Sequence, residues 1–474
     1  MARYITTTLP YVNNEPHIGH ALEFIQTDAL ARYWRLMGEE VFFNTGTDEH
    51  GQKIAQAAAK QGQEVQEYVD YFAERFRTLI QEVFGLSFDH FVRTTDAQHT
   101  TAAQEIWRRC NARGDIYKKK YSGLYCVGCE SFKAASDLVD GKCPDHQKEP
   151  EEIEEENYFF ALSQYQGYLE DYLAQEGVIE PEWRRKEALN FVQRGLEDLS
   201  ISREKSRIHW GIPVPGDDEQ IMYVWFEALT NYISTLGWPE DVEGNFKKFW
   251  EDGYVVQVAG KDQIRFQSIM WQAMLASADL PATQKIFYHG FVTSEGHKMS
   301  KSIGNVISPF EVVEKYGTEA TRYMLLRHVH PFDDADITWD KMDEWYTAHL
   351  VNGIGNVTAR IMKLAETHLE KPIKQPKANS FPEEYTSAIE RFSFNEALDY
   401  VWKQIGNLDE RIAETEPFKV VREDRERGIA IIQELVQELY VTARLLNPFM
   451  PETNKIIKDA ILTNIKPENL FPRI

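Results

Sequence analysis

The first 44 residues predict a β-α-β unit, and this unit constrains the fold more than any other feature of the chain. Residues 3–9 are rich in strand-forming side chains, residues 21–37 carry apolar residues at helical spacing up to Gly38, and residues 40–44 are again strand-like. A helix that follows a strand in this way offers unpaired N–H groups and the positive end of its dipole to an anion. We therefore expect an α/β fold with a phosphate-binding turn near residue 17.

The turn itself reads His17-Ile18-Gly19-His20. Its two histidines are three residues apart and face the same way on a helix. An imidazole can donate hydrogen bonds to phosphate oxygens, and Gly19 leaves room for an adenine or a ribose against the backbone. No Walker loop is evident, so an α-phosphate is the expected centre of reaction. Two histidines in a turn are also common on surfaces, and the motif alone leaves both interpretations open.

A second motif, Lys298-Met299-Ser300-Lys301-Ser302, follows Gly296. Its two lysines can neutralise the charge that grows on a departing pyrophosphate. A loop rich in Lys and Ser is most often solvated surface. Because this motif occurs together with the histidine motif, we interpret the pair as a site of nucleotide activation.

Three of the four cysteines show metal-binding spacing, in Cys126-x-x-Cys129 followed by Cys143-x-x-His146. This spacing predicts one tetrahedral, structural Zn²⁺ site with a closed ligand set. A redox Cys-x-x-Cys pair and four unconnected residues remain as alternatives. Cys110 is left over, and we expect it to be a buried core thiol.

Composition bounds the class of protein. A chain of 474 residues predicts two to four domains, and no apolar stretch approaches the roughly 18 residues of a membrane span. Without a signal peptide, we expect a cytoplasmic protein that does not bind membranes. The net charge of −23 argues against a general nucleic-acid binder, so positive charge must be local, with 118–120, 184–186 and Arg360 as candidates. We expect the acidic run 149–156 at the edge of a loop.

Further segments have clear periodicity. We predict strands at 254–258 and 286–288, and helices at 223–234, 267–276, 344–369, 384–411 and 425–446.

Nine motifs, in this order, are similar to those of class I aminoacyl-tRNA synthetases, and within that class to the methionyl-tRNA synthetase family. They are Leu9-Pro10-Tyr11, His17 to His20, Thr45 to Gly51, Cys126 to Cys129, Trp210 to Pro215, Tyr223 to Leu229, Gly260-Lys261-Asp262, His289-Gly290-Phe291 and Lys298 to Ser302. The resemblance implies a Rossmann-type parallel-sheet catalytic domain in two halves, 1–116 and 212–293, with an inserted zinc-binding connective domain at 117–211. A linker fold that contacts the tRNA stem (294–346) and an all-α anticodon-binding helical bundle (347–474) would follow.

The resemblance also implies an activity. A methionine–tRNA ligase forms methionyl-adenylate from L-methionine and ATP with Mg²⁺, and passes the methionyl group to the 3′ end of tRNA(Met), initiator and elongator. The insertion is short compared with that of relatives that edit their product. The chain stops where the helical region of this family closes, so we expect a monomer.

The resemblance assigns residues to each step. The catalytic residues would be His17, His20, Lys298 and Lys301. The ATP-binding residues would be these four together with Tyr11, Gly19, Gly260 and Asp262. The methionine site comprises Leu9, Tyr11, Asp48, Trp225, Ala228, Tyr232 and His289. Asp48 would pair with the α-ammonium, and aromatic rings suit the thioether. Since Trp225, Ala228 and Tyr232 have helical spacing, an ordinary core face is the alternative. The anticodon would be read by Asn356, Arg360 and Phe418.

Four positions depart from the family pattern. Glu227 stands where Asp is usual, Leu229 where one branch has Pro, Gln267 where His is frequent, and Phe418 where Trp is common. Two other classes of function remain open on sequence alone. One is a nucleotidylyltransferase that acts without RNA, and the other is a catalytically silent paralogue that binds RNA or supports assembly.

Overall fold

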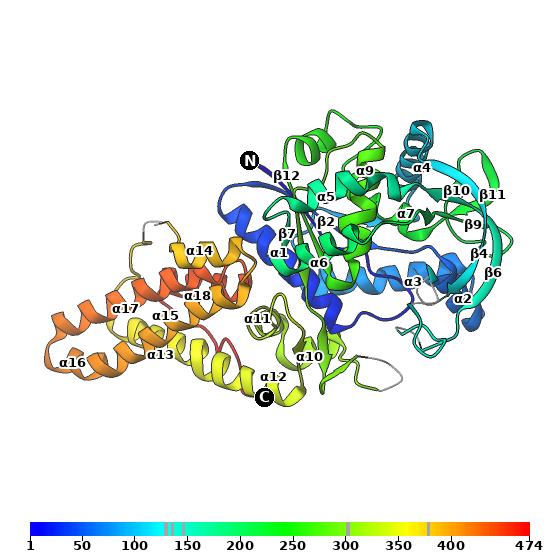
Figure 1. Cartoon of the computed structure of the whole chain (residues 1–474). Helices are drawn as coiled ribbons and strands as arrows, with labels where there is room; N and C mark the ends of the chain where they lie inside the picture. Colours follow the sequence, from blue (N-terminus) through cyan, green and yellow to red (C-terminus); the bar gives the residue numbers. More distant parts are fainter. Residues whose placement is uncertain (128–130, 134–136, 145–146, 300–303, 377–379) are drawn as a thin grey trace. The chain divides into compact units, whose positions relative to one another are not determined.

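The computed structural model describes residues 1–127, 131–133, 137–144, 147–299, 304–376 and 380–474 (Figure 1). The chain divides into two compact units. The first, here the sheet unit, comprises Met1–Pro16, Glu39–Glu82 and Phe88–Tyr288. The second, here the helical unit, comprises His17–Gly38, Val83–Ser87 and His289–Ile474.

A six-stranded sheet organises the sheet unit. Its order is β3-β2-β1-β12-β13-β7, formed by His90–Arg93, Glu40–Thr47, Ala2–Thr6, Tyr254–Gly260, Lys285–His289 and Ile179–Glu180. Strand β1 pairs in parallel with both β2 and β12, β2 with β3, and β13 with β7. The chain therefore builds outward in one direction through β2 and β3 and in the other through β12 and β13. The strand order reverses between β1 and β12, which is where sheets of this kind bind ligands at the carboxyl ends of their strands.

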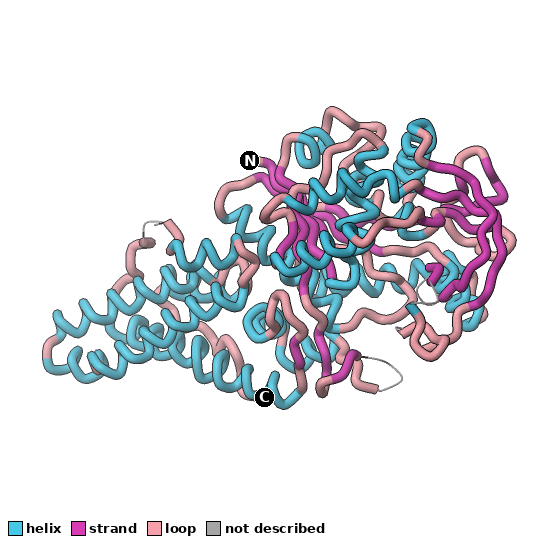
Figure 2. Tube along the Cα trace, in the orientation of Figure 1, coloured by secondary structure: helices cyan, strands magenta, loops and turns pink. Residues whose placement is uncertain are grey.

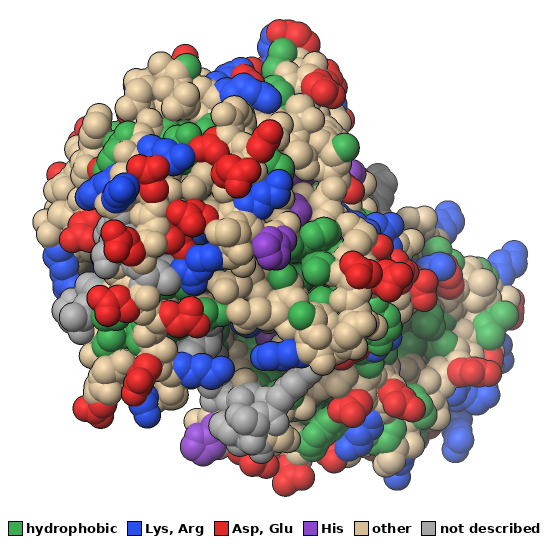
Figure 3. Space-filling model, turned by 90° about the vertical axis from the view of Figure 1, so that its right-hand side faces the viewer, with side chains coloured by type: hydrophobic (Ala, Val, Ile, Leu, Met, Phe, Trp, Pro, Cys, Tyr) green, Lys and Arg blue, Asp and Glu red, His purple; other side chains and the backbone are tan. Residues whose placement is uncertain are grey.

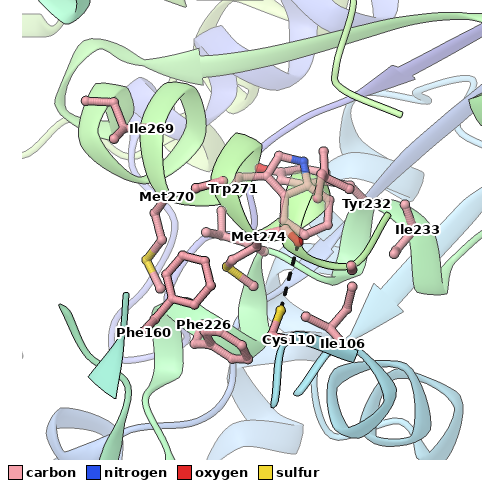
Figure 4. Packing of buried hydrophobic residues seen from close by; sticks show 14 of the residues in the cluster. Ile106, Cys110, Phe160, Phe226, Tyr232, Ile233, Ile269, Met270, Trp271 and Met274 are labelled. Atoms are coloured by element: carbon pink, nitrogen blue, oxygen red, sulfur yellow. Dashed lines mark hydrogen bonds between the residues drawn. The ribbon is translucent and has the colours of Figure 1, made fainter. Parts of the chain in front are cut away.

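The helices of the sheet unit form one apolar core with these strands. They are α2 (Gln52–Gln61), α3 (Val65–Thr78), α4 (Ala97–Arg113), α5 (Gln166–Ala174), α6 (Glu182–Gln193), α7 (Val224–Ala228), α8 (Asn231–Ser234) and α9 (Trp271–Ser277), with the short or irregular segments η1 (Leu79–Val83), η3 (Leu162–Tyr165), η4 (Phe246–Glu251), η5 (Lys261–Gln263) and η6 (Arg265–Met270). Figure 4 shows Ile106 and Cys110 packed towards Met274 and Phe226 in this core. The Cys110 thiol is fully buried and lies 3.9 Å from the Met274 carbonyl oxygen, and burial raises its pKa to about 12. The prediction of a core thiol is confirmed.

Two antiparallel sheets lie between the halves of the main sheet in sequence. Strands β5 (Ser131–Lys133), β4 (Ile116–Cys126), β6 (Glu151–Phe160) and β8 (Leu199–Ser200) form one, and β10 (Pro213–Val214), β11 (Asp217–Met222) and β9 (Ser202–Glu204) form the other. The acidic run 149–156 is therefore mostly strand, and the expected loop edge is wrong. Lys120 pairs in register with Glu156, and Lys118 Nζ lies 4.0 Å from Glu156 Oε2. Opposite charges across neighbouring strands stabilise an otherwise unfavourable acidic strand.

The helical unit begins with α1 (Ile18–Leu36) and continues with a small sheet, β15-β14-β16, of His297–Lys298, Val292–Ser294 and Ala335–Asp336. The remaining elements are helical, as the cyan tube in Figure 2 makes clear. They are α10 (Pro309–Tyr316), α11 (Thr318–His328), α12 (Trp339–Trp345), η7 (Tyr346–Gly355), α13 (Asn356–His368), α14 (Glu383–Glu390), α15 (Phe394–Thr415), α16 (Pro417–Glu423), α17 (Arg425–Leu445) and α18 (Pro451–Thr463). Helix α17 packs against α13, α15 and α18. The expected α/β class with a parallel sheet and a helical C-terminal region is confirmed.

Three expected helices are interrupted. The segment 384–411 splits at Phe392, whose φ of 61° lies in the left-handed region, and 344–369 kinks at Gly353 (φ −86°, ψ −110°). The segment 223–234 forms two short helices, α7 and α8. None of the described helices is both long and apolar enough to cross a membrane. On the face drawn in Figure 3, side chains of Lys and Arg lie interspersed with those of Asp and Glu.

Candidate active site

The two histidines of the first motif stack on each other at the start of α1. His17 precedes the helix in extended conformation, and its backbone N–H donates to His20 Nδ1 at 3.2 Å. The ring centroids are 3.6 Å apart with an interplanar angle of 15°. A Cβ atom at position 19 would lie 3.1 Å from two atoms of the His17 ring, so Gly19 leaves space for this stacking. The Ile18 N–H donates to the Ile307 carbonyl oxygen at 3.1 Å, which ties the helix start to the segment after the lysine motif.

The electrostatics of this pair favour a neutral donor. Burial, and then the neighbouring His17 and His289, hold the pKa of His20 well below its ordinary value. Since Nδ1 of His20 accepts a hydrogen bond, the neutral ring carries its hydrogen on Nε2. A neutral imidazole with a fixed tautomer is suited to donate to an anionic oxygen without exchanging a proton.

His289 is held by a buried carboxylate. Its Nδ1 lies 2.8 Å from the Gly290 carbonyl oxygen and its Nε2 lies 2.9 Å from Glu23 Oε2. The Gly290 carbonyl oxygen can only accept a hydrogen bond, so the Nδ1–H of His289 donates to it, and Nε2 faces the Glu23 carboxyl group. Sequence reasoning missed Glu23, although it follows His20 by three residues on the same helix. At Gly290, a Cβ atom would lie 2.1 Å from the Asp333 carbonyl oxygen, so only glycine fits beside His289.

Tyr11 and Asp48 come together because the pairing of β1 with β2 continues beyond both strands. The two residues form a parallel bridge, the Asp48 N–H donates to the Pro10 carbonyl oxygen at 3.0 Å, and the Val12 N–H donates to the Asp48 carbonyl oxygen at 3.1 Å. The Asp48 side chain is buried, and Leu9, two residues before Tyr11, is partly buried. A carboxylate is thus positioned at the carboxyl end of the sheet, as an ammonium ligand requires.

The aromatic residues of the predicted methionine site lie on α7 and α8. Trp225 stacks on Phe266, with centroids 4.1 Å apart and an interplanar angle of 9°. The Tyr232 hydroxyl donates to Gln267 Oε1 at 3.1 Å, so the departure at Gln267 keeps a hydrogen-bonding partner for this tyrosine. Ala228 is buried nearby in sequence. Sequence reasoning missed Phe266, which follows Asp262 by four residues and carries no motif signal of its own.

Glu227 lies between Trp225 and Ala228 and is buried between two histidines. His50 Nδ1 is 3.0 Å from Oε1 and His99 Nε2 is 2.8 Å from Oε2. Burial by itself would raise the pKa of Glu227, but these two histidines hold it below its ordinary value. Glu227, one methylene longer than the Asp that is usual at this position, therefore bridges His50 and His99 with its two carboxylate oxygens.

Gly260 and Asp262 flank the carboxyl end of β12, beside the point where the strand order reverses. Gly260 is the last residue of the strand and is buried, whereas Asp262 is exposed and accepts from Gln263 Nε2 at 3.2 Å. Lys298 belongs to β15, where it pairs with Thr293. Lys301 lies outside the described residues.

Two of the four predicted zinc ligands are described. Cys126 ends β4 and is buried, and Cys143 is buried in a turn where the Gln147 N–H donates to its carbonyl oxygen at 2.7 Å. Cys129 and His146 lie outside the described residues. Within the described ranges, no group of three or more His, Cys, Asp or Glu side chains is arranged to hold a metal ion.

The predicted anticodon residues lie on two helices of the helical unit, α13 and α16. Asn356 is exposed at the start of α13, Arg360 on the next turn forms an ion pair with Asp409 of α15, and Phe418 of α16 is 41% exposed.

Comparisons with known proteins agree on one family. The family model for class I tRNA synthetases (M) matches residues 3–153 and 135–362. The methionine–tRNA ligase of Caldanaerobacter subterraneus subsp. tengcongensis is 40% identical over 95% of this chain and 72% of its own length. That of Thermotoga maritima is 37% identical over 98% of this chain and 76% of its own.

A solved structure has the same fold. Mycobacterium tuberculosis methionyl-tRNA synthetase, in complex with methionyl-adenylate, superposes with a TM-score of 0.89 at 36% identity and covers 97% of this chain and 93% of its own. Sequence and structure comparisons therefore agree over nearly the whole length. The chain belongs to the methionyl-tRNA synthetase family of class I tRNA synthetases.

Proposed function

We infer that this chain is an ATP-dependent methionine–tRNA ligase. The inference rests on one observation above others, its identity of 37–40% to methionine–tRNA ligases over at least 95% of its length. The reaction joins the methionine carboxylate to the α-phosphorus of ATP with loss of pyrophosphate. The 3′-terminal ribose hydroxyl of tRNA(Met), initiator or elongator, then displaces AMP.

The described side chains support distinct roles in the first step. We assign the stacked His17 and His20 to the phosphates of ATP, where the Nε2–H of neutral His20 donates to an oxygen, with Tyr11, Gly19, Gly260 and Asp262 around the nucleotide. Asp48 would hold the methionine ammonium, and Trp225, Phe266 and Tyr232 would contact its side chain, with Leu9, Ala228 and His289 completing the site. Lys298 and Lys301 would stabilise the departing pyrophosphate, and Mg²⁺ would enter with ATP. Catalysis then consists of positioning and charge stabilisation and needs no side-chain nucleophile.

Methionine-dependent ATP–pyrophosphate exchange tests this function directly across the twenty amino acids. Lys301→Ala should lower the exchange rate by orders of magnitude with little change in methionine affinity, because its charge is needed mainly in the transition state. Exchange with another amino acid, or none, would refute the ligase assignment. Equal losses in affinity and rate would show that the loop shapes the ground-state pocket.

We also propose one structural Zn²⁺ per chain, held by Cys126, Cys129, Cys143 and His146 within a connective domain at 117–211. The buried Cys126 and Cys143 support this proposal, because Cys thiolates are common ligands of structural Zn²⁺ sites. Cys143→Ser should lose the metal and lower thermal stability more than it lowers adenylate formation per folded molecule. Freshly purified protein without zinc would refute the proposal.

Recognition of the anticodon is assigned to residues 347–474, with Asn356, Arg360 and Phe418 as contacts, and the tRNA stem to 294–346. Arg360→Ala should leave ATP–pyrophosphate exchange intact and reduce tRNA charging roughly ten- to a hundredfold, since a lost charged contact to a base costs about 1–3 kcal/mol. Removing the partner with Asp409→Ala keeps the arginine and serves as the control. Normal charging by Arg360→Ala would make this assignment wrong.

A further inference from the structure

Four buried polar side chains of the sheet unit form one continuous hydrogen-bonded row. In order they are His50, Glu227, His99 and Ser234, and none is more than 7% exposed. The two oxygens of Glu227 lie 3.0 Å from His50 Nδ1 and 2.8 Å from His99 Nε2. The other ring nitrogen of His99, Nδ1, lies 3.2 Å from the Ser234 hydroxyl oxygen. We name this row the Glu227 chain, and the proposed reaction gives none of its members a role.

The hydrogens of the Glu227 chain can be placed without any extra proton. An ionised carboxylate only accepts hydrogen bonds, so His50 donates to it from Nδ1 and His99 donates from Nε2. A neutral His99 ring then carries no hydrogen on Nδ1, which accepts from the Ser234 hydroxyl. Each contact thus pairs one donor with one acceptor, and a buried network paired in this way holds its side chains in a single arrangement.

One half of the Glu227 chain joins the two ends of the proposed methionine site. His50 follows Asp48, the proposed ammonium ligand, by two residues in the segment after β2. Glu227 lies on α7 between Trp225 and Ala228, which are proposed to contact the side chain of methionine. The carboxylate of Glu227 therefore ties the helix that would contact the side chain to the segment that would hold the ammonium group.

The other half of the Glu227 chain holds α8. His99 belongs to α4, and this helix contacts both α7 and α8. Ser234 is the last residue of α8 and follows Tyr232, a third proposed contact of methionine, by two residues. The neighbouring Gln98 donates from Nε2 to the Ser234 carbonyl oxygen at 2.9 Å, so α8 is bound to α4 at two points. All three segments of the proposed methionine site are thus connected through buried hydrogen bonds.

A fixed connection between these segments bears on the choice of substrate. A thioether is at most a weak hydrogen-bond acceptor, so methionine differs from its homologues mainly in the length of its side chain. A site discriminates by length only if the ammonium ligand and the aromatic side chains stay at a fixed separation, because a wall that moves would accommodate one methylene more or less.

We propose that the Glu227 chain sets the length of the amino acid that this site accepts. Glu227 is the positioning residue of the chain, and it acts through His50 and α7 rather than by contact with methionine. This inference rests on the proposed ligase function and adds to it the determinant of side-chain length.

The test measures ATP–pyrophosphate exchange with methionine, with S-methylcysteine, which is one methylene shorter, and with ethionine, which is one methylene longer. Glu227→Ala and His99→Leu break the chain at different points. Each should reduce the preference for methionine over both homologues about tenfold in kcat/KM, because the aromatic wall is no longer held at a fixed separation. The KM for methionine should rise, whereas the KM for ATP and kcat with methionine should stay within about twofold of the unaltered protein.

A conservative variant separates length from charge. Glu227→Gln keeps the length of the side chain, and His99 can adopt its other tautomer, in which Nε2 accepts from the amide and Nδ1–H donates to Ser234. The preference for methionine should therefore stay within about threefold of that of the unaltered protein.

A second control removes a buried carboxylate elsewhere in the sheet unit. Asp115 is 6% exposed and accepts hydrogen bonds from the Tyr165 hydroxyl and, at 2.7 Å, from the Ser277 hydroxyl. Asp115→Ala should lower the thermal stability of the protein, as Glu227→Ala does, but leave the preference for methionine unchanged. Loss of stability alone is thereby distinguished from loss of positioning.

The proposal is overturned if Glu227→Ala and His99→Leu keep the preference for methionine, if Asp115→Ala reduces it equally, or if Glu227→Gln reduces it as much as Glu227→Ala. Should the two chain-breaking variants not fold, Ser234→Ala removes only the end of the chain. It should reduce the preference about threefold, and an unchanged preference would then overturn the proposal. Failure of the ligase assignment looks different, because the unaltered protein would then show no exchange with methionine.

Discussion

Each of the two units buries a carboxylate, but the side chains that bind it differ: histidines in the sheet unit and arginines in the helical unit. In the sheet unit, Glu227 accepts hydrogen bonds from His50 and His99. In the helical unit, Asp28 of α1 lies 2.7 Å from both Arg322 of α11 and Arg32, and accepts from the Ser87 N–H and hydroxyl. Arginine stays charged at every pH at which a protein folds, whereas histidine titrates near neutrality.

The arginine-held carboxylate, Asp28, has a structural role, whereas the histidine-held carboxylate, Glu227, lies beside residues proposed to bind the substrate. Burial opposes ionisation of Asp28, yet Arg322 and Arg32 hold its pKa below the ordinary value, and Arg322 also donates to the Phe449 and Pro448 carbonyl oxygens. The Asp28 cluster thus ties four separate segments of the helical unit together, namely α1, the segment of Ser87, α11 and residues 448–449. The Glu227 cluster instead supports α7, which carries two residues proposed to contact methionine.

Breaking the permanent pair should have the largest effect. Arg322→Met leaves Asp28 buried without its main cation and should lower the free energy of unfolding by roughly 3–5 kcal/mol. Urea unfolding followed by circular dichroism measures this loss. The double variant Asp28→Asn with Arg322→Met should lose less than the sum of the single variants, and additive losses would show that the two side chains do not act as a pair.

The histidine-held carboxylate should be less costly to neutralise. Glu227→Gln keeps the shape and one acceptor, so the free energy of unfolding should fall by about 1–3 kcal/mol. Because the folded-state pKa of Glu227 lies below its unfolded value, its contribution is present above the unfolded pKa and is lost as the pH falls through the folded one. The loss on Glu227→Gln should therefore be full at pH 7 and shrink below about pH 4, and urea titrations at the two pH values measure it. A loss equal to that of Arg322→Met would remove the contrast between the clusters.

The contrast also marks what sequence can and cannot foretell. The β-α-β unit was predictable because its signals are local, and Gly38 ends α1 with a φ of 83° as expected of a helix-closing glycine. The partners of Glu227 are 177 and 128 residues away in sequence, and no periodicity connects them. The same holds for Glu23 beside His289 and for Phe266 beside Trp225. The break at Phe392 was missed because neither glycine nor proline announces it.

The helical unit also contains a residue whose protonation affects stability, His328. His328 stacks on Trp345 with centroids 4.4 Å apart, and burial, Arg327 and His349 lower its pKa to about 3. As the pH falls, His328 takes up a proton at a higher pH in the unfolded chain than in the folded chain. The stability that the neutral ring provides is therefore present above pH 6.5 and is lost as the pH falls towards 3.

Between pH 7 and 5.5, His328→Gln should therefore remove about 1 kcal/mol of the acid-induced loss of stability. Guanidinium unfolding at both pH values measures the difference. His20, whose pKa is also lowered, remains in the variant and cancels in the comparison. An unchanged pH dependence would show that His328 is not the group responsible.

The smallest change in the free energy of unfolding is expected for an ion pair that is exposed to water. Lys118 Nζ lies 2.8 Å from Asp217 Oδ2, but the lysine side chain is 36% exposed, so solvent screens the pair and holding two side chains in place costs entropy. Lys118→Met should change the free energy of unfolding by less than about 1 kcal/mol, and this change should diminish further when salt is raised to about 1 M. Urea unfolding at low and high salt measures both. A loss comparable to that of Arg322→Met would mean that charge pairing as such, rather than its burial, decides the stability of this chain, and the distinction between the two units would lose its physical basis.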